Sequence, residues 1–265
     1  MKPHFLLFFI LQNFAFSQTS ILAKYEARYE LNYKPSRQSD FKLKNTFILL
    51  MNEKESFLQN MSHYIKDSLE NAGKLRKTGN MQTDIANYAK YAPELPYKIY
   101  TRKGTLKYFD TPNSRDQPFA YSESPKFNWV ITKDTKKISG VDCIKATTHM
   151  WGRKWVAYYS PKHPLPYGPY KFGGLPGLIF MIYDEADEYN FKLYRYNKRN
   201  NMNYTINIDA KTISKKEYNT LKTKADADID NMGIDFSKMD LKSKNQLIKT
   251  IQNNVKNKNH LEINE

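Results

Sequence analysis

A regular alternation of apolar and polar side chains near the start of the chain sets the strongest limit on its fold. From Ala23 to Tyr33 every second residue is apolar, and the residues between them are polar or charged. A period of two is that of a β-strand with one buried face and one solvent-facing face. We therefore expect a long strand here, ended by Lys34-Pro35-Ser36.

Further apolar runs follow, most of them separated by short turn-like segments. They predict strands at 41–51, 97–102, 105–109, 127–132, 141–150, 154–160, 178–184, 189–196 and 204–210. Lys103-Gly104 suits a hairpin turn between the second and third of these strands. Consecutive strands joined by short turns indicate antiparallel pairing. We predict an α+β fold whose main part is a curved, mainly antiparallel sheet, with a few helices.

Four segments have helical signals. One predicts a helix around Met81 and Ile85 within the polar stretch 74–95. Apolar residues at steps of four, followed by Gly73, predict a helix over 56–72. Ser214 and Glu217 have the spacing of a capping box and predict a helix to about residue 228. Residues 237–240 resemble a second helix start, and we expect the end from Asn253 to be frayed.

The first seventeen residues have the pattern of a secretory signal peptide. Lys2 precedes an apolar block at 5–11, and Ala15 and Ser17 are small residues at −3 and −1 of a cleavage site. This block is too short to span a bilayer, which needs about 20 residues, and no later segment is apolar enough. We predict an exported protein, periplasmic or secreted, that does not span the membrane. It would consist of a signal peptide (1–17), one β-rich domain (18–210) and a helical, partly flexible tail (211–265).

The composition limits the classes of partner and site. A net charge of +15 invites a nucleic-acid interpretation, but the lysines are spread along the chain and no nucleic-acid signature is present. We predict no nucleic-acid partner; an envelope protein, a lipid or a glycan is the expected kind of partner. The single cysteine, Cys143, excludes an intrachain disulfide and a cysteine-based metal cage.

The most unusual segment precedes the predicted strand 178–184. It consists of Gly174, Leu175, Pro176, Gly177, Leu178 and Ile179. Pro176 and Gly177 suit the central positions of a type II turn, in which Gly177 would have a positive φ. Because the following run is apolar on both faces, we expect this strand to be covered on both sides. A turn that feeds the sheet centre is favoured over a backbone loop shaped around a ligand.

These six residues match the signature of the GLPGLI family of exported Bacteroidota proteins, which this chain resembles over most of 20–196. Further matching segments are 129–131, 134–138, 143–148, 152–153, 157–159 and 168–169. Val141 and Tyr158 depart from the pattern, each an apolar residue in place of another. The resemblance implies export and a strand-rich fold, but no catalytic residues. The layout also resembles the half-barrels of lipoprotein carriers, in which helices cross the concave face of a curved sheet.

The sequence has no assembled catalytic motif. It lacks a Gly-x-Ser-x-Gly elbow, a phosphate loop and paired metal-ligand histidines, so we predict no metal and no cofactor. The acidic residues of 184–188 are expected in an exposed turn. An envelope hydrolase assembled by the fold is the alternative. It would need His149 or His163 near Cys143, Ser160 or an acidic residue in a cleft.

Aromatic residues are the remaining candidates for a binding site. They are Trp151, Trp155, Tyr159, Tyr167, Tyr170 and Phe172. Such side chains present large amphipathic surfaces with few rotatable bonds, which suits sugars, peptides and acyl chains. The alternative is that they fill the core of a curved sheet. The leading hypothesis is a non-catalytic envelope protein that binds an apolar or amphipathic ligand, or a partner protein.

Overall fold

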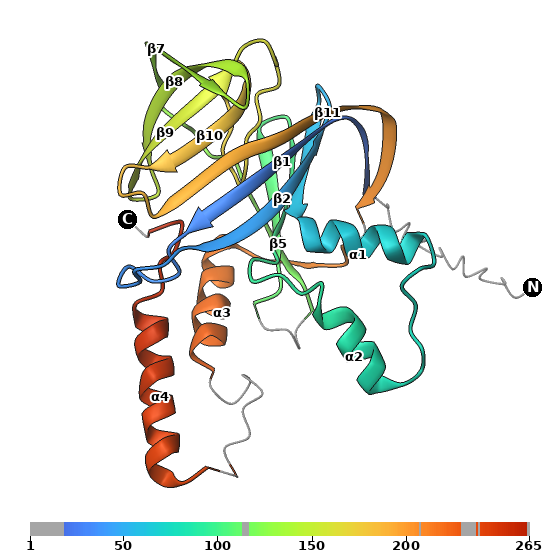
Figure 1. Ribbon diagram of the computed structural model, residues 1–265, viewed down its shortest axis with the longest axis vertical. Helices are drawn as coiled ribbons and strands as arrows, with labels where there is room; N and C mark the ends of the chain where they lie inside the picture. Colours follow the sequence, from blue (N-terminus) through green and yellow to red (C-terminus); the bar gives the residue numbers. More distant parts are fainter. Residues whose placement is uncertain (1–18, 113–116, 207, 229–236, 238, 264–265) are drawn as a thin grey trace, which may run out of the picture.

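One large open sheet organises the molecule. The computed structural model describes residues 19–112, 117–206, 208–228, 237 and 239–263 (Figure 1). The strands are β1 (Thr19–Tyr33), β2 (Leu43–Met51), β3 (Glu55–Asn60), β4 (Lys98–Arg102), β5 (Thr105–Asp110), β6 (Phe119–Glu123), β7 (Val130–Ile138), β8 (Val141–Met150), β9 (Arg153–Ser160), β10 (Leu178–Asp184), β11 (Tyr189–Ile206) and β12 (Lys211–Thr212). The helices are α1 (Met61–Asn71), α2 (Met81–Ala89), α3 (Lys215–Ala227) and α4 (Leu241–Lys256).

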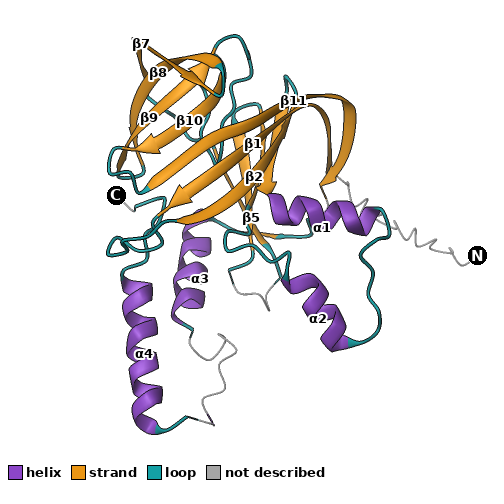
Figure 2. Cartoon of the chain, viewed as in Figure 1, coloured by secondary structure: helices purple, strands orange, loops and turns teal. Residues whose placement is uncertain are grey.

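The strand order is β12-β6-β5-β4-β3-β2-β1-β11-β10-β9-β8-β7. All pairings between these strands are antiparallel except the short parallel contact of β12 with β6. Figure 2 shows the long strands β1 and β11 bending across the middle of the sheet. The predicted α+β fold with a curved, mainly antiparallel sheet is confirmed.

The alternating strand at the start of the chain is β1. Ala27, Tyr29 and Leu31 are fully buried on one face, as the period of two predicts. The other face is less exposed to solvent than predicted, because Glu26 is buried between Arg28 and Arg199. The middle of β1 is therefore covered on both sides.

The segment predicted as a helix over 56–72 divides into a strand and a helix. Residues 55–60 form β3, which pairs with β2 and β4, and the Asn60 side chain caps α1 by accepting from the Ser62 amide. Phe57 therefore belongs to a strand, where it packs with Ile21 and Ile206. Two-sided pairing in the sheet overrides the four-residue spacing of the apolar side chains.

Several other element predictions need adjustment. The segments 189–196 and 204–210 are mostly one strand, β11, which ends at Ile206, and β6 has no counterpart among the predicted strands. The strand predicted at 127–132 begins only at Val130. The capping box at Ser214 and Glu217 is present and starts α3 as predicted.

Loops, more than helices, cover the main core face. This face carries Phe47 and Leu49, and the loop between β9 and β10 packs on it through Leu165, Phe172 and Leu175. The carrier-like comparison placed helices across such a face, but α1 packs on the opposite side. Among the helical residues that the structure describes, Tyr218 of α3 is the buried one. No helix in the described ranges is long and apolar enough to cross a bilayer.

Candidate ligand-binding site

The signature segment enters the sheet through a close approach to β9. The φ of Gly177 is not positive, so the predicted type II turn is wrong; the Gly177 amide instead donates to the Leu175 carbonyl at 2.8 Å. A Cβ built on Gly177 would lie 2.7 Å from the carbonyl carbon of Ser160. Glycine is needed here because the backbone of β9 leaves no room for a side chain. The following residues Leu178, Ile179 and Phe180 are buried.

The residues before the signature form a narrow loop that folds back on itself. The Gly174 amide donates to the Pro166 carbonyl at 3.1 Å, and Gly174 has a φ of 82°. The Trp129 indole donates to the Gly173 carbonyl at 2.9 Å. Ile179 donates to the Tyr167 carbonyl at 3.0 Å, which ties the loop to β10. These bonds fix the loop over 166–174 against the sheet.

A cavity of about 330 Å³ lies between this loop and strands β2 to β5. Its sheet side includes the buried residues Leu49, Leu58, Ile99 and Leu106. Its loop side consists of Pro166, Tyr167, Gly168, Tyr170, Lys171, Phe172, Gly173 and Gly174. Its exposed lining residues include Glu53, Lys54 and Lys103. The volume is within the range of small-molecule sites, roughly 300–1,000 Å³, and the mixture of apolar walls with a few polar groups is typical of them.

The structure divides the six aromatic candidates into two groups. Tyr167, Tyr170 and Phe172 line the cavity. Trp151, Trp155 and Tyr159 are outside its lining. Trp155 and Tyr159 are buried in the core, and the two tryptophans contact Phe172 with ring centroids 5.3 Å and 4.7 Å away. The second group therefore supports the loop from behind.

Lys171 is a site residue that the sequence analysis did not single out. Its side chain has no exposed surface, donates to the Tyr121 hydroxyl at 2.8 Å and pairs with Glu123 and Glu262. Four rings surround the ammonium, those of Tyr108, Tyr121, Trp151 and Tyr170, with centroids 4.8–5.8 Å away. Burial lowers the pKa of Lys171, and the two carboxylates only partly oppose this effect.

Glu262 supplies its carboxylate from the C-terminal segment. The Tyr170 hydroxyl donates to it at 2.6 Å, Lys215 pairs with it at 2.8 Å, and Lys171 completes the set. We call Tyr170, Lys171 and Lys215 the carboxylate cradle. Burial alone would raise the pKa of Glu262, but Lys171 and Lys215 together hold that pKa below its ordinary value. The carboxylate is therefore charged at neutral pH.

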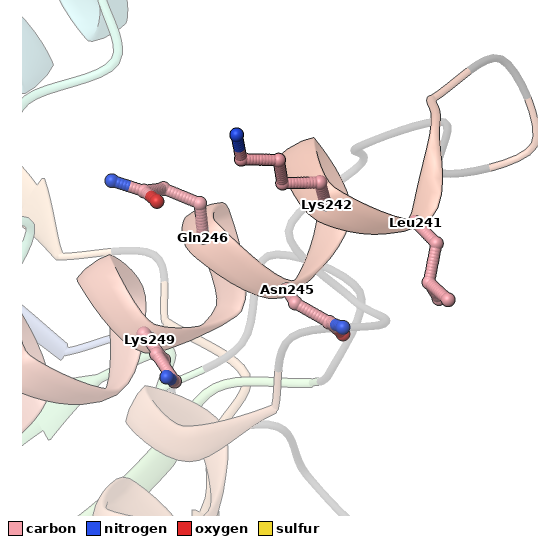
Figure 3. Close-up of a pocket in the computed structure, with 5 residues that line it drawn as sticks. All are labelled: Leu241, Lys242, Asn245, Gln246 and Lys249. Atoms are coloured by element: carbon pink, nitrogen blue, oxygen red, sulfur yellow. The ribbon is translucent and has the colours of Figure 1, made fainter.

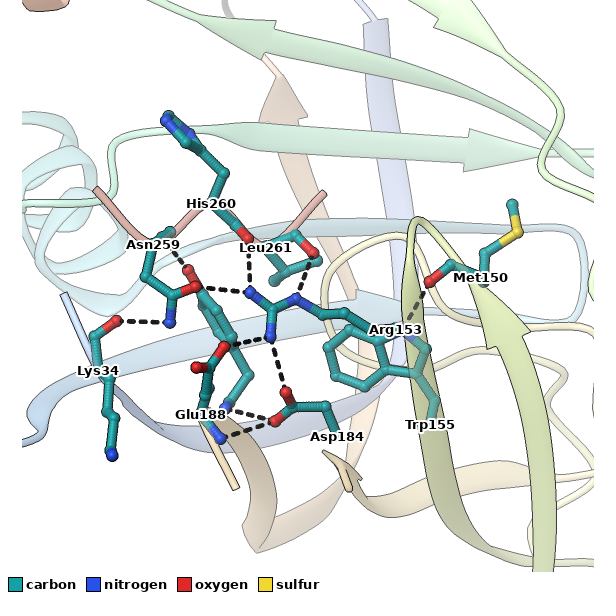
Figure 4. A network of polar contacts seen from close by, with 10 residues as sticks. Lys34, Met150, Arg153, Trp155, Asp184, Glu188, Asn259, His260 and Leu261 are labelled. Carbon is teal, nitrogen blue, oxygen red and sulfur yellow. Dashed lines mark hydrogen bonds and ion pairs between the residues drawn. The ribbon is translucent and has the colours of Figure 1, made fainter. Parts of the chain in front are cut away.

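The same segment is held a few residues earlier by Arg153 (Figure 4). The guanidinium donates to the carbonyls of His260 and Leu261, to the Asn259 side chain, and to the carboxylates of Asp184 and Glu188. These bonds use all five N–H groups of the arginine. Asp184 was predicted in an exposed acidic turn, but its side chain is 2% exposed and holds Arg153.

The predicted frayed end therefore differs from the structure. α4 continues to Lys256, and Asn259 is buried and donates to the Lys34 and Pro35 carbonyls at 3.0 Å and 2.9 Å. Ile263 donates to the Trp151 carbonyl at 3.1 Å. These partners are more than a hundred residues away in the sequence, so no local pattern could have indicated them.

The side chains considered for catalysis form no hydrogen bond with one another, although the His163 amide donates to the Ser160 carbonyl at 3.1 Å. Cys143 is buried, which raises the pKa of its thiol to about 11, and its Sγ contacts the Val141 carbonyl. The Ser160 hydroxyl and the His163 Nδ1 are buried without a hydrogen-bond partner, and His149 is exposed. Within the described ranges, no three His, Cys, Asp or Glu side chains gather in a way that could hold a metal. Among the residues that the structure describes, no hydrogen bond therefore joins the nucleophile and the base that the hydrolase alternative needs.

A second hollow lies beside α4 (Figure 3). Its lining residues are Leu241, Lys242, Asn245, Gln246 and Lys249, all from that helix and all exposed. With no buried polar group and no second element among its described walls, it lacks the features of a binding site.

Comparisons with known proteins inform the fold more than the site. No family model and no curated protein matches the chain. Two solved structures of PNGF-II, in space groups C2 and P21, have TM-scores of 0.51 and 0.54 at 16% identity. They cover 76% and 77% of this chain, which spans about a third of PNGF-II (33% and 34%). The LolA superfamily protein NE2245 from Nitrosomonas europaea has a TM-score of 0.29 at 11% identity, over 70% of this chain and 88% of that protein. The likeness to PNGF-II shows a shared fold alone.

Proposed function

We propose that this protein is a non-catalytic binding protein that takes an apolar or amphipathic ligand into the cavity beneath residues 166–174. The observation that carries the proposal is the cavity of about 330 Å³, with Leu49, Leu58 and Ile99 on its sheet side. Burial of an apolar ligand surface against such walls contributes roughly 25 cal/mol per Å². The loop that bears the signature then has two parts, a structural turn at 174–177 and a ligand-facing part before it.

The cellular setting is part of the same proposal. The sequence pattern of residues 1–17 supports export to the periplasm or beyond, although these residues lie outside the described ranges. The signature at 174–179 supports membership of the GLPGLI family. A lipid, a glycan or an envelope protein is the proposed kind of partner, and the apolar cavity favours a lipid-like molecule among these.

Binding of a fluorescent apolar probe, N-phenyl-1-naphthylamine, to the full chain tests the proposal. Ile99→Phe places extra volume in the cavity, so we expect its probe affinity to fall at least about tenfold. Val130→Phe is the matched control, because Val130 is an exposed residue on the edge strand β7, away from the cavity.

Equal probe binding by the parent and both variants would contradict a site in this cavity. Circular dichroism of each variant separates loss of binding from loss of folding. Native mass spectrometry of protein purified from its own envelope then shows which molecule it carries. A co-purified protein in place of a small molecule would favour the partner-protein version of the hypothesis.

A further inference from the structure

The cavity and the carboxylate cradle are adjacent parts of one structure. Tyr170 and Lys171 line the cavity, and the same two residues hold the carboxylate of Glu262. Lys215, from the start of α3, completes the cradle at 2.8 Å from the second carboxylate oxygen. Tyr170 and Lys171 therefore join the wall of the cavity to a preformed binding site for a carboxylate.

We propose that the ligand of the cavity is an amphipathic carboxylate whose head group replaces Glu262 in the cradle, so that the C-terminal segment is a built-in competitor. This inference rests on the proposed function, because it assigns a chemical class to the molecule in that cavity. The apolar part of the ligand contacts Leu49, Leu58, Ile99 and Leu106.

Charge balance makes a carboxylate the fitting head group. Lys171 and Lys215 carry two positive charges, and Glu123, which pairs with both, supplies one negative charge. Glu262 supplies the second. Because the Lys171 side chain has no exposed surface, its charge depends on the paired carboxylates and is poorly solvated when one of them is lost. A neutral ligand that displaced Glu262 would leave a buried cation with incomplete pairing, whereas a carboxylate restores the balance.

The contacts of Glu262 allow this exchange. Arg153 holds residues 259–261 and makes no contact with Glu262 or Ile263. Outside the cradle, the described contacts of Glu262 and Ile263 are made by Ile263. Its amide donates to the Trp151 carbonyl, and its side chain packs against Gly152. The Glu262 side chain is 18% exposed, so solvent already reaches it. Its carboxylate can leave the cradle while the Arg153 contacts stay in place.

The experiment compares octanoate with 1-octanol as competitors of N-phenyl-1-naphthylamine at neutral pH. In the parent protein, Glu262 competes with octanoate for the cradle. We therefore expect octanoate and 1-octanol to bind the parent with affinities within about threefold of each other. In Glu262→Gln the side chain at position 262 is no longer charged and competes less well for the cradle. We therefore expect octanoate to bind this variant about tenfold more tightly than the parent. The affinity for 1-octanol should change less than twofold. Glu185→Gln is the matched control: it removes one negative charge in the exposed turn, where Glu185 pairs with Lys154.

A second variant keeps the test decisive if Glu262→Gln folds poorly. Ile263→Ala weakens the packing on Gly152 and leaves every charge of the cradle in place, so we expect a rise of about threefold in octanoate affinity alone. Octanoate should also raise the melting temperature of Glu262→Gln, and 1-octanol should not. Equal changes for acid and alcohol, or an octanoate gain in Glu185→Gln as well, would overturn the carboxylate site. If neither the probe nor either competitor binds any variant, the proposed cavity function itself fails.

Discussion

Arg153 and Lys171 are two buried cations that hold the same C-terminal segment, yet their surroundings differ in kind. Arg153 lies on β9, its carboxylate partners Asp184 and Glu188 are on and just after β10, and none of the three lines the cavity. Lys171 lies in a loop, lines the cavity, and takes one of its two carboxylates from Glu262.

The difference separates a structural cation from one that is suited to exchange. The donors of Arg153 are all used, two by Asp184 and Glu188 and three by residues 259–261, and loss of a carboxylate partner leaves buried charge behind. Lys171 is also fully paired, but the partner that completes its charge balance, Glu262, comes from the segment that follows α4 and lies outside the sheet. Burial alone does not distinguish the two sites; the origin of the counter-ion does.

The largest expected effect comes from the Arg153 site. Arg153→Met leaves the buried carboxylate of Asp184 without its cation, so we expect a loss of about 3–5 kcal/mol in the free energy of unfolding. Denaturant titration followed by circular dichroism measures it. Arg153→Lys keeps the charge but loses the planar fork, and should lie between the parent and Arg153→Met. A loss below 1 kcal/mol would contradict a structural role for Arg153.

Lys171→Met should cost less, about 2–3 kcal/mol by the same measurement. Glu123 and Glu262 keep Lys215 as a partner and are each partly exposed, so their charges stay partly solvated. The methionine fills the volume among the four rings. If Lys171→Met is as costly as Arg153→Met, the cradle is as structural as the Arg153 site, and exchange at Lys171 loses its basis.

The signature turn offers a smaller test. Gly177→Ala forces a Cβ against the Ser160 carbonyl, so we expect a loss of about 2 kcal/mol. Gly140→Ala is the comparison for backbone strain without a steric clash. A Cβ there meets nothing within 4 Å, so its cost in the free energy of unfolding, about 1 kcal/mol, comes from the φ of 81°. Unchanged stability of Gly177→Ala with lost probe binding would make residues 174–177 part of the ligand site instead of a structural turn.

Sequence patterns predicted the parts of this molecule that depend on near neighbours. The alternation in β1, the Lys103-Gly104 hairpin turn with φ values of 52° and 77°, and the capping box of α3 follow from local rules, and the structure has all three. The helix predicted from Ser56 failed because β3 gains pairing on two sides, which a single segment does not reveal.

The candidate site was predicted only in part, for the same reason. Aromatic enrichment identified Tyr167, Tyr170 and Phe172, which line the cavity, but gave the same weight to Trp155, which is core. Lys171 and Glu262 are 91 residues apart. Nothing in the neighbourhood of either residue shows that the fold joins them. The local sequence does not distinguish the buried Lys171 from the exposed lysines.

The smallest expected effect is the pH dependence of the cradle. The pKa of Glu262 is lowered in the folded protein, because Lys171 and Lys215 outweigh the effect of burial. A lowered carboxyl pKa stabilises the fold above the unfolded value, near 4.5, and this stabilisation is lost as the pH falls through the folded pKa. We therefore expect the melting temperatures of the parent and Glu262→Gln to differ at pH 7 and to converge as the pH falls below about 4.5. Glu26 also has a lowered pKa but is present in both proteins, so its contribution cancels in the difference. A difference that stays constant down to pH 3 would mean that the charge of Glu262 contributes nothing to its hold on the cradle, and Lys171 would then belong with Arg153 as a purely structural cation.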